Sequence, residues 1–178
     1  VKAEEKEEEE RSERQCTATG NRNPHSTTLS TPSHSIKMAT HDAPQVLPGS
    51  TDNEKLLYLC SELTHKQQAV WFLNAFWEVG MEAEAETFWE YVREIVEIDI
   101  ENRAQGCSLD EVEAHRFLEK RGETLTVLAL RANLRKSGAL GEKERPKRVP
   151  LTHYLLYKYA DHNEKINYHL LVNASQGD

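Results

Sequence analysis

The sequence lacks any run of eighteen apolar residues, so it predicts no membrane-spanning helix. It also lacks runs of alternating apolar and polar residues bounded by turn residues, which excludes a β-sheet fold and leaves an all-α fold. Its three cysteines, Cys16, Cys60 and Cys107, are far apart and have no CxxC spacing. This usage is typical of a reducing, intracellular setting, and we predict a cytoplasmic protein.

Positive charge is scarce, because the chain has 22 Lys and Arg against 30 Asp and Glu, a formal net charge of −8. A nucleic-acid-binding surface needs clustered cations, so nucleic acid is excluded as a partner. The run from Lys143 to Arg148 is the local exception. No glycine-rich phosphate loop, GxSxG or HExxH motif is present, so we predict neither catalytic residues nor an enzyme.

Residues 1–50 differ in composition from the rest of the chain. The acidic run Glu7–Glu10 is followed by Ser, Thr, Asn and Pro as far as Pro48. Such a segment buries too little apolar surface to offset its chain entropy, so we predict a disordered tail. Met38 is the first methionine, and we expect residues 1–37 to be translated leader or vector-derived sequence.

Residues 51–178 form the predicted helical domain. The first helix is expected over Glu54–Leu63, and Thr64 with Gln67 offers a capping box for the second. Gly80 ends this second helix, and a third is expected from Glu82 to about Asn102. A polar connector with two prolines then separates the central helices from a last one over residues 151–165.

The second helix is apolar around most of its circumference and rich in aromatic residues. Trp71, Phe72, Phe76 and Trp77 lie within eight residues. Aromatic residues at helical spacing are usually buried, so we predict that these four belong to the core. The alternative is that they form a binding surface for a partner.

The stretch from Ser108 to Leu134 predicts two helices that meet at Gly122. Ser108 is the expected N-cap of the first helix, with Glu111 three residues on closing a capping box. Neither helix is long enough to be stable alone, so each must bury an apolar stripe against other helices. The expected stripes consist of Val112, Phe117 and Leu118 on the first helix, and of Leu125, Leu128 and Ala132 on the second.

The order helix, polar loop, helix occurs twice in succession, as in paired EF-hands. An EF-hand calcium loop places oxygen ligands at fixed positions and a bidentate glutamate at position 12. With Leu109 at position 8, the first loop has Asn102 at position 1 and Glu113 at position 12. A lengthened loop can add acidic residues upstream. The candidate ligands for one calcium ion are therefore Asp99, Glu101, Asn102, Asp110 and Glu113.

The second loop departs further from a calcium site. With Val149 at position 8, His153 takes the place of the bidentate acid. Three cations in the loop, Arg145, Lys147 and Arg148, repel a calcium ion. We predict no calcium binding there.

Three segments resemble a known family. They are LNAFW at 73–77, LDEVEAHRFLEKRGETLTVLALR at 109–131 and LTHYLLYKY at 151–159. These runs resemble a group of EF-hand calcium-binding proteins of slime moulds, fungi and other simple eukaryotes, and more distantly the plasmodial calcium-binding protein of slime moulds. The resemblance implies an EF-hand-like bundle of paired helix-loop-helix units, with degenerate loops in this chain.

Together these patterns favour a non-catalytic regulatory or protein-interaction module with weak or lost calcium binding and an unidentified protein partner. One alternative is a functional calcium-binding protein that uses the loop Asn102–Glu113. Another, by analogy with such families, is a cytoskeleton-associated scaffold. The sequence does not indicate which oligomeric state the protein adopts.

Overall fold

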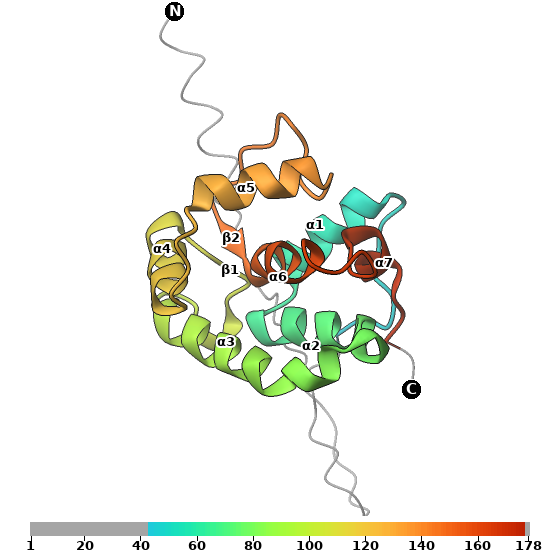
Figure 1. Ribbon diagram of the computed structural model, residues 1–178, viewed down its shortest axis with the longest axis horizontal. Helices are drawn as coiled ribbons and strands as arrows, with labels where there is room; N and C mark the ends of the chain where they lie inside the picture. Colours follow the sequence, from blue (N-terminus) through green and yellow to red (C-terminus); the bar gives the residue numbers. More distant parts are fainter. Residues whose placement is uncertain (1–42, 177–178) are drawn as a thin grey trace, which may run out of the picture. The chain divides into compact units, whose positions relative to one another are not determined.

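The structure is a computed structural model that describes residues 43–176. Within these residues the fold is mostly α-helical, which confirms the predicted all-α class, and none of the helices is long and apolar enough to cross a membrane. In Figure 1, α6 lies between α3 and α4 on one side and α1 and α7 on the other. The leader expected over residues 1–37 and most of the expected disordered tail lie outside the described residues.

The first two helices begin at capping boxes. Helix α1 spans Asp52–Glu62, and Thr51 caps it together with Glu54. Helix α2 spans His65–Ala75, and the predicted box of Thr64 and Gln67 is present. Each box satisfies two backbone N–H groups that a helix start would otherwise leave unpaired. The chain enters α1 through a segment that packs on the core, because Leu47 is only 2 % exposed.

The expected helix from Glu82 begins and ends differently in the structure. Two short 3-10 turns, η1 (Trp77–Val79) and η2 (Met81–Glu84), flank Gly80, whose φ of 109° is the left-handed conformation that favours glycine. Helix α3 then spans Ala85–Ile98. It ends before the predicted Asn102 because Asp99 leaves the helical region, with ψ of 85°.

The central helices are shorter than expected, and their starts are shifted. Helix α4 spans Glu111–Lys120, and its N-cap is Asp110, paired with Glu113. The predicted capping box of Ser108 and Glu111 is therefore wrong, because Ser108 belongs to a strand. Val112, expected on the buried side, is 61 % exposed.

Helix α5 spans Val127–Lys136 and buries a different stripe from the predicted one. Its buried residues are Val127, Leu130 and Leu134. Leu128, which the sequence placed in the core, is 74 % exposed, so that prediction is wrong. Both stripes have helical spacing, and the choice between them depends on which face meets the neighbouring helices.

Two short strands, which the sequence did not predict, join the two loops. Strand β1 is Ser108–Leu109, just before α4, and strand β2 is Val149–Pro150, just before α6. They pair antiparallel, with Leu109 opposite Val149 and Ser108 opposite Pro150. The ladder brings the segment before α4 beside the segment before α6 (Figure 1).

The C-terminal part completes the core. Helix α6 spans Leu151–Ala160, five residues shorter than predicted, and a further helix, α7, spans Tyr168–Asn173. Helix α7 contacts α1 and α2. The indole Nε1 of the buried Trp71 donates to the carbonyl of Leu171 at 2.9 Å. This bond gives the most buried tryptophan its polar partner and ties α7 to α2.

Candidate functional site

Asp99, the first candidate calcium ligand, lies in the interior and has other partners. Its Oδ2 lies 2.9 Å from Nε2 of His65, and both side chains are 0 % exposed. Its Oδ1 accepts the backbone N–H of Asn102 at 3.0 Å. The backbone N–H of His65 in turn donates to the carbonyl of Gly106 at 2.9 Å. The carboxylate thus fastens the first loop to the start of α2.

The burial of His65 sets the charge state of this pair. Desolvation lowers the pKa of His65, although the neighbouring Asp99 opposes the shift. A neutral imidazole donates one N–H. Here the N–H is on Nε2 of His65, and Oδ2 of Asp99 accepts it. The other ring nitrogen, Nδ1, is buried and has no hydrogen-bond partner among the described residues. A lowered pKa thus favours a neutral His65, which donates to the carboxyl group of Asp99.

Gly106 allows this pair to exist. A Cβ atom at this residue would lie 1.8 Å from Oδ2 of Asp99 and 2.8 Å from Nε2 of His65. Its φ is −70°, which every residue can adopt, so the constraint is space and not backbone conformation. The sequence analysis did not identify this role, because His65 and Asp99 are distant in the chain.

Asp110 and Glu113, the last two candidate ligands, are brought together by the start of α4. Glu113 donates its N–H to Oδ1 of Asp110 at 2.8 Å, and Asp110 donates its N–H to Oε2 of Glu113 at 3.0 Å. Oε1 of Glu113 accepts from Ile100 at 3.4 Å. Glu101 and Asn102 are exposed in the same loop. Within the described residues, no three His, Cys, Asp or Glu side chains form a group that could hold a metal ion.

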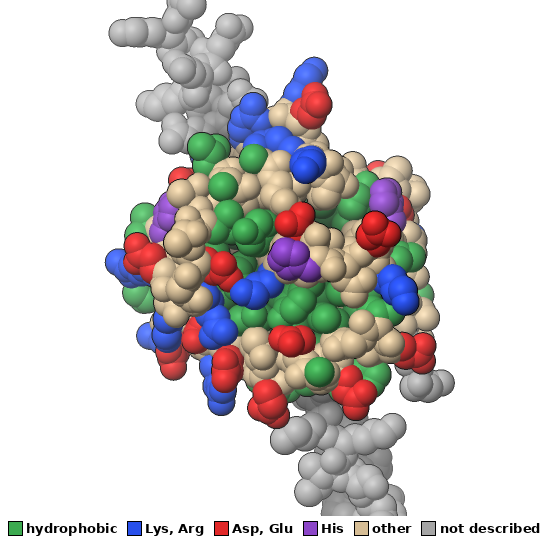
Figure 2. Space-filling view, viewed as in Figure 1, with side chains coloured by type: hydrophobic (Ala, Val, Ile, Leu, Met, Phe, Trp, Pro, Cys, Tyr) green, Lys and Arg blue, Asp and Glu red, His purple; other side chains and the backbone are tan. Residues whose placement is uncertain are grey.

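In the second loop, the side chain of Arg145 binds backbone carbonyls. Nη1 of Arg145 donates to the carbonyls of Glu142 and Glu144, at 2.8 Å and 3.1 Å. Nη2 of Arg135 donates to the same carbonyl of Glu144 at 2.9 Å. Figure 2 shows Lys and Arg side chains gathered over this segment between α5 and β2, at the top of the view. The guanidinium of Arg145 thus binds two backbone carbonyls of its own loop.

Arg148 links the second loop to the first. Its Nε donates to Oγ of Ser108 at 3.0 Å, and its Nη2 donates to the carbonyl of Ser108 at 2.8 Å. Both contacts lie beside the β1–β2 ladder. This fork holds the two loops together.

Gln68 of α2 is a further site residue that the sequence analysis missed. Its Nε2 donates to the carbonyls of Leu63 and Cys107, at 2.8 Å and 2.7 Å. Its Oε1 accepts from both the N–H and the hydroxyl of Thr152, at 3.1 Å and 2.9 Å. The side chain is 0 % exposed and fully hydrogen-bonded. Its position just before the apolar run of α2 is the sequence feature that could have indicated a buried polar side chain.

His153, which the sequence analysis set at position 12 of an EF-hand frame, is buried in α6. Burial lowers its pKa to about 4, and the nearby charge of Arg131 adds to the effect. In the unfolded chain its pKa is 6.5, so the unfolded state takes up a proton first as the pH falls. We expect His153 to cost roughly 3 kcal/mol of stability between pH 6.5 and pH 4.

Urea unfolding at pH 7 and pH 4.5 measures this loss. His153→Gln should flatten the pH dependence, whereas His162→Gln, which changes an exposed histidine, should leave it unchanged. Equal pH dependence in the two variants would show that His153 does not titrate as proposed.

The four aromatic residues of α2 and of the turn that follows it divide into a buried set and an exposed residue. Trp71, Phe72 and Phe76 are at most 3 % exposed and lie in the core. Trp77 is 43 % exposed and borders a shallow surface hollow with Glu78 and Glu82. A binding role for this region therefore depends on Trp77 alone.

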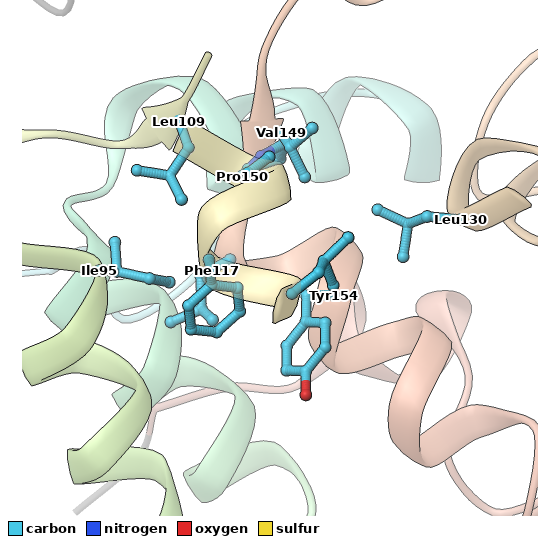
Figure 3. Close-up of a pocket in the computed structure, with 10 residues that line it drawn as sticks. Ile95, Leu109, Phe117, Leu130, Val149, Pro150 and Tyr154 are labelled. Atoms are coloured by element: carbon cyan, nitrogen blue, oxygen red, sulfur yellow. The ribbon is translucent and has the colours of Figure 1, made fainter. Parts of the chain in front are cut away.

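An apolar pocket lies between α3, α4, α5 and α6, beside the β1–β2 ladder (Figure 3). The space inside it is about 10 Å³, room for a single water-sized molecule. All the residues that line the pocket are buried, and their side chains nearly fill it. Its lining consists of Ile95, Leu109, Ala114, Phe117, Leu118, Leu130, Val149, Pro150, Leu151 and Tyr154.

Comparison of the chain with protein-family models, with curated proteins and with solved structures finds no match in any of the three.

Proposed function

We propose that the chain is a non-catalytic, EF-hand-like regulatory or protein-interaction module with weak or lost calcium binding, acting in the cytoplasm. The pairing of Leu109 with Val149 is the observation that supports it most. In the calcium-loop frame both residues occupy position 8. Two related helix-loop-helix units, α3 with α4 and α5 with α6, would pair in this equivalent register.

The contacts of the two loops support the loss of calcium binding. Calcium takes six to eight oxygen ligands. In the first loop Asp99 binds His65, and Glu113 caps α4. In the second loop Arg145 binds two carbonyls, and its positive charge opposes a second cation. Internal side chains thus do the work that a calcium ion does in an active EF-hand.

A second candidate function is calcium binding by the first loop. Asp110 and Glu113 lie side by side at the start of α4, with Glu101 and Asn102 exposed in the same loop. To bind there, a calcium ion would have to displace the backbone N–H groups that now donate hydrogen bonds to these carboxylates. Because those hydrogen bonds also cap α4, binding would have to offset their loss.

Calcium titration calorimetry on the full chain tests the proposal. We expect no binding heat up to millimolar calcium from a protein whose circular dichroism is helical both in chelator and in calcium. Heat that saturates at micromolar calcium would contradict the proposal and favour the second candidate.

A further inference from the structure

The short connector between α4 and α5 is fixed to α3 by Arg121. Nη1 of Arg121 lies 3.2 Å from Oε1 of Glu94 and 3.6 Å from Oε2 of Glu90. Its guanidinium carbon lies 4.7 Å from the ring centroid of Tyr91, in a cation–π arrangement. All three partners belong to α3, so one side chain fixes the connector to that helix.

The same connector is fixed to α6 by Glu123. Its Oε1 accepts from the hydroxyl of Tyr154 at 3.2 Å and from Nζ of Lys158 at 2.5 Å. Gly122, with φ of 69°, makes the turn between the two anchoring residues, and the N–H of Glu123 closes it on the carbonyl of Leu118. The hydrogen bonds and the charge of Lys158 also lower the pKa of Glu123 and favour its anionic form.

Tyr154 connects these polar contacts to the apolar pocket. Its ring lines the pocket and lies 5.0 Å from the ring of Phe117 and 5.4 Å from that of Tyr91. In Figure 3 its hydroxyl points away from the other labelled side chains. That hydroxyl donates to Glu123, so the connector holds a wall of the pocket in place.

We infer that Arg121 and Glu123 form a connector latch, which keeps the apolar pocket between α3, α4, α5 and α6 closed. Because the connector joins α4 to α5, fixing it to both α3 and α6 opposes separation of the four helices. Release of the latch would let these helices move apart and expose buried apolar side chains. The inference is independent of calcium binding, since it depends on contacts at the connector alone.

The burial of the latch distinguishes it from ordinary surface ion pairs. Arg121, Glu94 and Glu123 are 21 %, 19 % and 22 % exposed at their side chains, whereas the outer partners Glu90 and Lys158 are 50 % and 37 % exposed. The neighbouring pair of Lys120 with Glu97 also joins α4 to α3, but its side chains are 47 % and 69 % exposed. Exposed pairs contribute little because water and salt screen them. The pair of Lys120 with Glu97 is therefore a matched control, because Lys120 is next to Arg121 in the chain and binds the same helix, α3.

Binding of the apolar dye anilinonaphthalene sulfonate to the full chain tests the latch. In the double variant Arg121→Gln, Glu123→Gln we expect dye fluorescence to rise roughly fivefold, because the open form becomes more populated. Lys120→Gln should bind no more dye than the parent protein. Amide hydrogen exchange should quicken in α4, α5 and α6 while α1 and α7 stay protected.

Unchanged dye binding and unchanged exchange in a folded double variant would overturn the inference. If the double variant does not fold, Lys158→Met decides, because it removes the ammonium that binds Glu123 and that lies 6.0 Å from the ring centroid of Tyr154. A rise in dye binding in this variant, absent in Lys120→Gln, supports the latch. No rise in it contradicts the latch.

Discussion

Replacing Gly106 by alanine is expected to lower the free energy of unfolding by about 3 kcal/mol or more. The added Cβ would overlap Oδ2 of Asp99 at 1.8 Å, which forces the carboxylate away from His65. Both partners are fully buried, so neither can recover a hydrogen bond from water. Urea unfolding at pH 7, followed by circular dichroism, measures the loss.

Gly141→Ala is the matched control for this substitution. A Cβ at Gly141 would lie 3.2 Å from the carboxyl group of Glu144, an exposed side chain that can move. We expect a change within about 1 kcal/mol. Equal losses in the two variants would show that the space beside Asp99 and His65 is not what restricts residue 106.

Replacing Gln68 by leucine is expected to cost about 3 kcal/mol or more. The substitution keeps the side chain large, but it leaves two carbonyls and both donors of Thr152 without their present partner. Each buried polar group that stays unpaired costs about 1–3 kcal/mol. The same unfolding experiment measures the effect.

Gln105→Leu provides the comparison, because Gln105 is an exposed residue of the first loop. It should change stability by no more than about 0.5 kcal/mol. A Gln68→Leu protein as stable as Gln105→Leu would mean that the amide does not hold the loop, α2 and α6 together.

The helical class could be predicted from the sequence because helical spacing and capping residues are local signals. Thr64 with Gln67 marked the start of α2 correctly. The exposed face of α5 could not be predicted, since Leu128 and Leu130 are equally apolar and only the neighbouring helices decide which is buried. The two-residue strands and the six-residue α7 are too short to produce a periodic pattern.

The partners of the candidate ligands could not be predicted for a different reason. Residue type and spacing identified Asp99 and Glu113 as acids in a loop. The partner of Asp99 is His65, 34 positions earlier in the chain, and that contact exists only once α2 packs beside the loop. Glutamate is a residue type that serves both as a calcium ligand and as a capping residue. In this structure Glu113 caps α4.

Calcium titration of the full chain, followed residue by residue in amide NMR spectra, tests the central claim most directly. The account predicts that the signals of Gly106, Leu109 and Val149 stay in place from chelator to millimolar calcium, because internal side chains already hold both loops. Shifts that saturate at micromolar calcium in the parent protein and disappear in Glu113→Gln would contradict it, since they would identify the first loop as a working calcium site.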